Sequence, residues 1–317
     1  MKTYKPKPLF IERMKLILGK DSKNYFKKIQ IEPLKSIRVN TLKISVKDLR
    51  KNLENKNWKI NQPFKDFPEI MIIKSELQPG ELGRSLEHLL GDYYIQEISS
   101  TLPVMVLNPK PNEVILDLCS APGSKTTQIA ARMENTGTII ANDLKLGRIK
   151  ILASNLERCG VTNTIITKSP GDVLCRKLKN ENFEINKILI DAPCSGEGTI
   201  RTSPKTVQAW NLKRIYSLSR IQKNLLTNAI EILDEGEIVY STCTHAPEEN
   251  EEVLDFILRK FKNVKIEKLS LPMEIKFRKG ITKWQEKEYL EEIKYSCRIY
   301  PHLSNSEGFF IAKLKVE

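Results

Sequence analysis

The sequence predicts an α/β protein in which a mostly parallel sheet forms the larger part and a smaller α+β domain precedes it. From residue 113 onward, short apolar runs rich in β-branched residues alternate with helical patterns, which is typical of strands joined by helical crossovers. Before residue 107 the chain is lysine-rich, has mixed periodicity and lacks this alternation. The predicted division is therefore 1–107 for the N-terminal domain and 108–317 for the larger domain.

The N-terminal domain combines helical and strand patterns. Apolar residues recur at helical spacing in 11–18 and 46–53, and the segments 36–40 and 70–73 have strand character. A further helix is predicted over 81–90. Tyr93 and Tyr94 could stack on bases, but aromatic residues beside an apolar run more often pack in the core, and we favour packing.

The larger domain contains a regular series of buried strands. Each is short, apolar and followed by a turn and a helical pattern, or by the end of the chain. Helices are predicted from about residue 125, over 148–158 and over 214–233. The predicted strands are 114–118, 138–143, 164–166, 188–190, 237–240 and a closing strand at 309–314.

Composition indicates a polyanionic partner. The 317 residues include 52 Lys and Arg against 39 Asp and Glu, which gives a net charge of +13. A merely solvated basic surface is the alternative. No apolar run approaches the roughly 18 residues needed to cross a bilayer, so we expect a cytoplasmic protein without membrane contact.

The six cysteines do not form a recognisable metal or disulfide framework. They are spread along the chain without any C-x-x-C pair, so we expect reduced thiols and no metal site. Two of them follow predicted strands. Cys194 comes shortly after the strand that ends near Asp191, and Cys243 follows the strand at 237–240. Because ligands bind at the carboxyl edge of open α/β sheets, these two thiols and Asp191 form the proposed core of a site.

A turn with small residues follows the first strand of the larger domain. It runs from Asp117 to Thr126, and small side chains there would allow a ligand to approach the backbone and the amides of a helix N-terminus. A P-loop is excluded, because Ser124 stands where that motif needs its second glycine. A tight turn without a ligand is the alternative.

Acidic residues recur at the ends of successive predicted strands. Asp143 stands where an acidic side chain binds ribose hydroxyls in nucleotide-binding folds, Asp172 follows the third strand, and Asp191 follows the fourth. Carboxylates would repel a pyrophosphate and favour a cationic ligand that contains adenosine. S-adenosylmethionine fits this description.

Several motifs resemble the Sun-type RNA cytosine-5 methyltransferase family, and the resemblance covers nearly the whole chain. The paired cysteine contexts, P-C-S-G at Cys194 and S-T-C at Cys243, are its most specific part. Ser120, Ser124 and Thr244 differ from the residues usual in the family, but no reactive group is lost. The matching segments are 38–41, 96–100, 117–126, 191–196, 240–244, 248–251 and 298–313.

The resemblance implies a Rossmann-like, S-adenosylmethionine-dependent catalytic domain and a role for each matched residue. Cys243 would add to carbon 6 of cytosine, and Asp191 would donate a proton to the ring nitrogen that gains charge. Cys194 would assist release of the covalent product, and Lys125 would contact the base. The implied cofactor residues are Cys119, Ser120, Ala121, Pro122, Gly123, Ser124, Lys125, Asp143, Arg148, Asp172 and Asp191.

For the remaining cysteines and histidines we favour structural roles. Cys159, Cys175 and Cys297 are expected to be small buried hydrophobes, and Cys119 to pack beside the cofactor. His245 and His302 have no partner at metal-ligand spacing. Candidate phosphate contacts in the N-terminal domain are Lys2, Lys5, Lys7, Lys15, Lys27 and Lys28.

The predicted activity is methylation of carbon 5 of cytosine in RNA, with tRNA ranked before ribosomal RNA and a monomer as the working form. The alternatives are the same reaction on ribosomal RNA and a non-catalytic RNA-binding assembly factor. A DNA cytosine-5 methyltransferase is disfavoured, because its nucleophile usually stands in a P-C-Q context, whereas Cys194 precedes Ser195 and Gly196.

Overall fold

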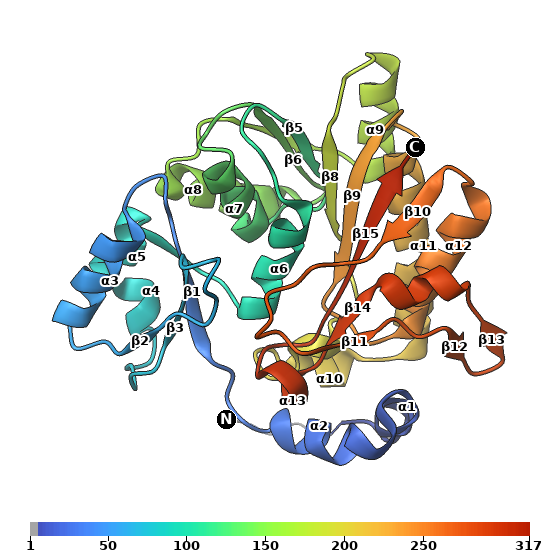
Figure 1. The fold of residues 1–317 in the computed structure, drawn as a ribbon, viewed down its shortest axis with the longest axis horizontal. Helices are drawn as coiled ribbons and strands as arrows, with labels where there is room; N and C mark the ends of the chain where they lie inside the picture. The colour runs from blue at the N-terminus through green and yellow to red at the C-terminus, as the bar shows by residue number, and fades with distance from the viewer. Residues whose placement is uncertain (1–5) are drawn as a thin grey trace.

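The computed structural model describes residues 6–317 and consists of a large mixed sheet and a small antiparallel sheet (Figure 1). The large sheet has the strand order β11-β14-β15-β9-β8-β5-β6-β7, with β10 also paired to β15. Its strands are β5 (Val114–Asp117), β6 (Thr138–Asp143), β7 (Thr164–Lys168), β8 (Lys187–Asp191), β9 (Gly236–Thr242), β10 (Val264–Glu267), β11 (Phe277–Lys279), β14 (Cys297–Ile299) and β15 (Phe309–Val316).

Strands β5 to β9 run parallel to one another, which confirms the predicted architecture. The closing strand β15 is antiparallel to β9. The helices of this part are α7 (Ser124–Arg132), α8 (Leu146–Cys159), α9 (Gly171–Asn180), α10 (Lys205–Ala209), α11 (Leu212–Ile230), α12 (Glu251–Lys260) and α13 (Pro301–Ser304). Short elements are the 3₁₀ turns η2 (Glu197–Thr199), η3 (Pro247–Glu249) and η4 (Glu291–Tyr295) and the hairpin β12 (Lys283–Trp284) with β13 (Lys287–Glu288).

Helices cover both faces of the large sheet, and the alternation of side chains along β8 shows this directly. Ile188 and Ile190 pack in the core formed with α9, α11 and α12, whereas Leu189 packs with α7 and α8. All three side chains are fully buried. A strand buried on both faces has no polar alternation, which is why its sequence is a continuous apolar run.

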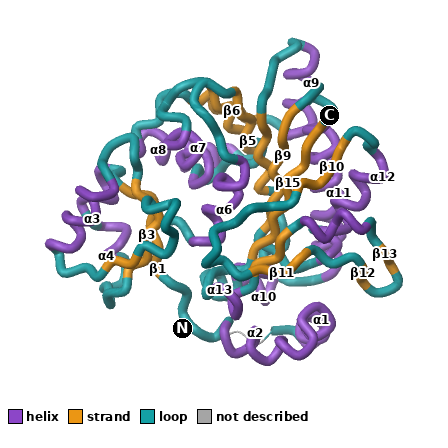
Figure 2. The backbone as a smooth tube through the Cα atoms, viewed as in Figure 1, coloured by secondary structure: helices purple, strands orange, loops and turns teal. Residues whose placement is uncertain are grey.

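The small sheet has the order β2-β3-β1-β4 and is antiparallel throughout. One of its faces is covered by α3, through Leu49 and Leu53, and the other joins the core of the large domain through Ile70 and Ile72. Figure 2 shows α6 (Ile98–Leu107) between the two sheets. The elements of this part are β1 (Lys35–Val39), α3 (Val46–Asn55), β2 (Ile60–Asn61), β3 (Ile70–Ile73), α4 (Glu81–Arg84), α5 (Leu86–Leu90) and β4 (Tyr93–Ile95).

One predicted helix of this region, 81–90, is wrong as a single element. It is divided into α4 and α5 at Ser85, whose backbone is extended and whose side chain accepts a hydrogen bond from the amide of His88. A serine at such a position serves as an N-cap and starts a new helix, even where the apolar periodicity continues across it.

The first helices pack away from the small sheet. These are α1 (Pro8–Leu18), the 3₁₀ turn η1 (Gly19–Asp21) and α2 (Ser22–Lys28), which lie below α10 and α13 in Figure 1. Phe10, Met14 and Tyr25 are buried against Trp210 and Tyr300 of the large domain. No helix within 6–317 is both long enough and apolar enough to cross a membrane.

Candidate active site

The two strand-end cysteines are in direct contact. Strands β8 and β9 are parallel neighbours, with Asp191 opposite Ser241, so the loops that follow them emerge side by side at the same edge. Cys194 Sγ lies 3.1 Å from Cys243 Sγ, although 49 residues separate them in the chain. Both residues are partly exposed. The structure thus brings together the two thiols that the sequence singled out.

The sulfur contact keeps Cys194 protonated. The hydrogen bond to Cys243 is the main cause that raises the pKa of the Cys194 thiol, and burial adds to it. A thiol that holds its proton is a hydrogen-bond donor. Cys194 can therefore donate to the sulfur of Cys243 and stabilise negative charge on it.

Asp191 is held by two donors, one on each carboxylate oxygen. Lys125 Nζ donates to Oδ2 at 2.7 Å, and Ser241 Oγ donates to Oδ1 at 2.9 Å. Lys125 Nζ also donates to Ser100 Oγ at 3.0 Å and lies over the ring of Phe309. These contacts join α6, α7, β8 and β9 at one point, and they place a carboxylate and a buried ammonium group at the same edge as the cysteines.

The turn between β5 and α7 offers unpaired backbone amides. Gly123 precedes α7 with φ 106°, in the left-handed region that favours glycine, and no side chain caps the helix. Such an N-terminus attracts a carboxylate or phosphate group. Ser120 Oγ donates to the carbonyl oxygen of Asn142 at 2.9 Å and fixes the turn to β6.

Carboxylates gather beneath this turn. Asp117 is completely buried, and its Oδ1 has no hydrogen-bond partner, while Oδ2 accepts from Thr126 Oγ1 at 2.7 Å. Burial raises the pKa of Asp117 to about 7, and the charges of Asp191 and Asp143 add to the shift. Burial also raises the pKa of Cys119, so it stays a thiol. The acidic surroundings suit a cationic ligand, and S-adenosylmethionine fits them.

Asp143 and Arg148 lie together at the rim of this turn. Arg148 Nη1 is 3.0 Å from Asp143 Oδ2, and its other terminal nitrogen donates to the carbonyl oxygen of Ala121. The carboxylate of Asp143 is nearly buried and also accepts from the amide of Lys145. Asp143 is thus placed at the end of β6, where ribose hydroxyls are expected.

Asp172 stands apart from this group. It lies in the first turn of α9, and its partly exposed carboxylate is paired with Arg176 of the same helix at 3.2 Å. Its contact with the cofactor stays a prediction. The remaining predicted cofactor residues, Ala121, Pro122 and Ser124, lie in the turn itself or at the start of α7.

Sequence reasoning gave no role to the glutamates around the start of α12. Glu248, Glu249 and Glu251 are buried, each exposed by 2% or less. Glu251 forms a bidentate pair with Arg298, and Glu248 pairs with Arg13 at 2.6 Å. Several glutamates at the start of a helix usually indicate a solvated surface. The only sequence signal for a functional role was therefore that the segment 248–251 matches a motif of the family.

Arg38 links the small sheet to the cofactor turn. Its guanidinium donates to the carbonyl oxygen of Ser124 and to Thr127 Oγ1, both at 2.8 Å, and to Gln96. It is 2% exposed and none of these partners is a carboxylate, so burial lowers the pKa of Arg38 to about 10. The matched segments at 38–41 and 96–100 therefore support α7.

Several of the structural roles predicted for buried residues are confirmed. Cys159, Cys175 and Cys297 are exposed by 2% or less, and Tyr93 and Tyr94 are buried. His245 stacks on Tyr300, and burial lowers the pKa of His245 to about 3, so this imidazole is neutral.

The candidate phosphate contacts differ in their surroundings. Lys15 and Lys27 are exposed, and Lys7 Nζ donates to the carbonyl oxygen of Trp210 at 2.6 Å. Lys28 is half-buried; partial desolvation and the nearby cation Arg201 both lower its pKa. Lys2 and Lys5 lie outside the described residues.

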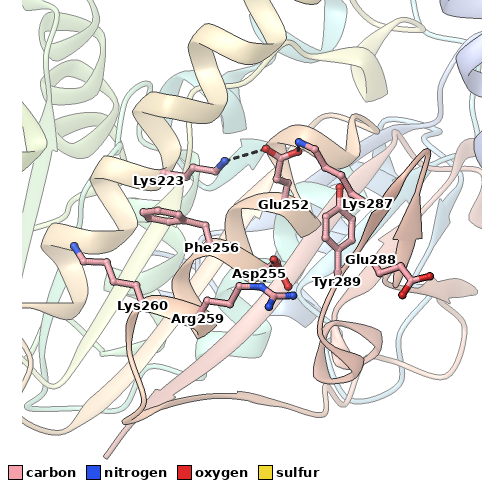
Figure 3. Close-up of a pocket in the computed structure, with 9 residues that line it drawn as sticks. All are labelled: Lys223, Glu252, Asp255, Phe256, Arg259, Lys260, Lys287, Glu288 and Tyr289. Carbon is pink, nitrogen blue, oxygen red and sulfur yellow. Dashed lines mark hydrogen bonds and ion pairs between the residues drawn. The ribbon is translucent and has the colours of Figure 1, made fainter.

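A surface cavity of about 600 Å³ lies between α11, α12 and β13, and none of the predicted site residues lines it (Figure 3). Its charged groups neutralise one another. Glu252 lies 3.0 Å from Lys223 and 2.8 Å from Lys287, and Asp255 pairs with Arg259 at 2.7 Å. These charged groups are therefore already paired with one another.

Comparisons with known proteins agree on one family. Residues 104–315 match the family described as 16S rRNA methyltransferase RsmB/F, and residues 7–98 match the N-terminal domain of 16S rRNA methyltransferase RsmF.

Two curated relatives act on different RNAs. A tRNA (cytosine(49)-C(5))-methyltransferase of Pyrococcus abyssi is 42% identical over 286 residues, which is 90% of this chain and 89% of that protein. Ribosomal RNA small subunit methyltransferase F of Aliivibrio salmonicida is 41% identical over 89% of this chain, which spans 57% of that longer protein. Among solved structures, NSun6 from Pyrococcus horikoshii with SFG superposes with a TM-score of 0.81 at 26% identity and covers 98% of both chains.

Proposed function

Because the chain belongs to the RsmB/F family of RNA cytosine-C5 methyltransferases, we propose that it methylates carbon 5 of cytosine in RNA with Cys243 as the nucleophile. S-adenosylmethionine is the cofactor of this family and, when bound, supplies an electrophilic methyl group. The observation that carries the proposal is the 3.1 Å contact between Cys194 Sγ and Cys243 Sγ beside the Asp191–Lys125 pair. A structural or assembly role would not need two thiols in contact at this edge.

The first step is the addition of Cys243 to the base. The thiol of Cys243 loses its proton to water, and the resulting thiolate forms a bond to carbon 6 and makes carbon 5 nucleophilic. Negative charge develops on the ring and on nitrogen 3. The ammonium group of Lys125 donates a hydrogen bond to the carboxylate of Asp191. A proton of this ammonium group passes to Asp191, and Asp191 protonates nitrogen 3.

The second step is release. After methylation, the proton on carbon 5 passes to water, the ring double bond forms again, the bond from carbon 6 to Cys243 breaks, and the proton on nitrogen 3 returns through Asp191 to the Lys125–Asp191 pair. Cys243 leaves as a thiolate, which accepts a hydrogen bond from the thiol of Cys194. Because burial and the sulfur contact keep Cys194 protonated, it is suited to this donor role.

Cys194→Ala separates the two steps. Addition and methylation need Cys243 alone, so this variant should form the covalent adduct and release it slowly. We expect a protein–RNA complex that survives denaturing electrophoresis in Cys194→Ala and is absent in Cys194→Ala/Cys243→Ala. Absence of any adduct in the single variant would contradict the release role.

We further propose that the substrate is tRNA, that residues 1–107 bind it and that residues 108–317 carry the reaction. The support for tRNA is the 42% identical relative, matched over about nine tenths of both chains. The net charge of +13 and the exposed side chains of Lys15 and Lys27 favour contacts with phosphate groups. We also propose that the protein is cytoplasmic and that it is a monomer. Light scattering of the purified protein would check the monomeric state.

The test is incubation with labelled S-adenosylmethionine and either bulk tRNA or ribosomal RNA, followed by nucleoside mass spectrometry. We expect 5-methylcytidine in the tRNA pool. The same product in ribosomal RNA alone would retain the reaction and change the substrate. No labelled nucleoside in either pool, despite binding of the cofactor, would favour an RNA-binding assembly factor.

A further inference from the structure

A hydrogen bond joins the two cysteine loops one residue after each sulfur. Ser195 Oγ lies 2.7 Å from Thr244 Oγ1, and both residues are buried, with 4% and 1% of their surfaces exposed. The amide of Gly198 also donates to the carbonyl oxygen of Cys243 at 2.8 Å. The loops after β8 and β9 are therefore fastened to each other directly beside the reactive groups.

The direction of the hydroxyl bridge follows from its partners. Thr244 Oγ1 donates to Glu197 Oε2 at 3.3 Å, so its single proton is used there. Ser195 Oγ must then donate to Thr244 Oγ1, which also accepts from the amide of Ala246. The hydrogen bonds therefore run in one direction, from Ser195 to Thr244 and from Thr244 to the carboxylate of Glu197.

A second carboxylate holds the other side of the bridge. Glu249 Oε2 accepts from the amide of Ser195 and from Gln222 Nε2, both at 2.9 Å. Glu197, at the far end, also accepts from Trp210 Nε1 at 2.6 Å. All five residues in these hydrogen bonds are nearly or fully buried, so each bond is protected from water.

We propose that Ser195 and Thr244 are positioning residues that hold Cys194 Sγ against Cys243 Sγ, and that this contact sets the rate of product release. The inference rests on the roles proposed above for the two cysteines. Addition to carbon 6 and methylation at carbon 5 need only the sulfur of Cys243. Departure of that sulfur as a thiolate, with the carbon 5 proton passing to water, needs the Cys194 thiol within hydrogen-bond distance.

The chain provides matched variants. Ser195→Ala and Thr244→Val each remove one hydroxyl of the bridge, and the two test it from opposite ends. Thr244→Ser keeps the hydroxyl and should rescue the behaviour. Thr136→Val is the control for loss of a threonine hydroxyl elsewhere, since Thr136 Oγ1 donates to the carbonyl oxygen of Met133 between α7 and β6. Thermal unfolding of all four shows that each variant folds.

The first readout needs no RNA. Diamide oxidises two adjacent thiols to a disulfide and is itself reduced to the hydrazine, so the rate of formation of the Cys194–Cys243 disulfide reports the sulfur contact. We expect this rate to fall about fivefold in Ser195→Ala and Thr244→Val, because a fivefold change corresponds to the net free energy of one hydrogen bond. Thr244→Ser and Thr136→Val should match the unaltered protein. Equal rates in all five proteins would overturn the positioning role.

The second readout is the lifetime of the covalent protein–RNA adduct in a single turnover, measured beside the formation of 5-methylcytidine. In Ser195→Ala and Thr244→Val the lifetime should rise about fivefold, while methyl transfer changes by less than about twofold. An unchanged lifetime, or an equal loss in both steps, would overturn the proposal. If the unaltered protein methylates no RNA, the proposed function fails, and the diamide rates still decide whether the bridge positions the sulfurs.

Discussion

The two sheets of this protein place their polar side chains differently. In the large sheet, Asp191, Cys194 and Cys243 follow the strands at the carboxyl edge and remain partly exposed. In the small sheet, Arg38 and Asn40 are exposed by only 2% and point toward the large domain. Arg38 donates to the start of α7, and Asn40 Nδ2 donates to the carbonyl oxygen of Cys159 at the end of α8, at 2.7 Å.

The two sheets therefore contribute differently to the site. The large sheet supplies the reactive groups, whereas the small sheet holds the two helices that bound the cofactor turn. A buried guanidinium without a carboxylate partner is costly, so its retention indicates that the backbone it supports must keep its position. The predictions below separate chemistry at the edge of the large sheet from support by the small one.

The largest expected effect is at Cys243. Cys243→Ala removes the nucleophile, and we expect methyl transfer to fall by at least about 10³-fold while S-adenosylmethionine binding is unchanged. Nucleoside mass spectrometry and calorimetry measure the two quantities. Cys297→Ala, in the buried part of β14, is the control and should remain active. Normal turnover of Cys243→Ala would move the nucleophile elsewhere.

Arg38→Met tests the support given by the small sheet. It removes hydrogen bonds to Ser124 and Thr127, so we expect the free energy of unfolding to drop by about 2–4 kcal/mol, measured by chemical denaturation. Arg50→Met removes an exposed pair with Glu54 in the same region and should cost less than about 1 kcal/mol. Equal losses of unfolding free energy in the two variants would mean that the hydrogen bonds of Arg38 do not stabilise the start of α7.

Asp143→Ala tests the cofactor site directly. Loss of a charge-assisted hydrogen bond to a ribose hydroxyl should weaken S-adenosylmethionine binding about tenfold, as measured by calorimetry. Asp255→Ala also removes a carboxylate paired with an arginine, but in the cavity of Figure 3, and should leave the affinity unaltered. Unchanged affinity in Asp143→Ala would move the ribose contact to another residue.

The last prediction concerns the pH dependence of stability. The pKa of Asp117 is about 7 in the folded protein, above the ordinary value of 3.8, so the folded state binds more protons than the unfolded state between these values. Stability is therefore lost as pH rises through this window, by at most about 1.4 kcal/mol per pH unit for one group. Asp117→Asn should show a shallower loss between about pH 5 and 7 in denaturation experiments. An identical slope would show that Asp117 is ionised throughout.

The sequence alone determined the parallel strands of the large domain, its closing strand, three of its helices and the residues at the sheet edge, but not α9, α12 or strands β10 to β14. Continuous apolar runs such as 188–190 can be satisfied only by burial on both faces, so the pattern itself predicts a covered parallel sheet. The carboxyl ends of parallel strands share one edge, so the sequence by itself predicts that Asp191, Cys194 and Cys243 lie together.

Only the tertiary structure decided how close these groups lie and what holds them. The contact between the two sulfurs depends on β8 and β9 being neighbours in register, and the Ser195–Thr244 bridge depends on the packing of both loops. Buried Glu249 accepts hydrogen bonds on Oε2 from Ser195 and Gln222, and both residues are distant from it in the chain. Local patterns show which residues are polar or apolar, but such long-range pairing arises only when the chain is folded.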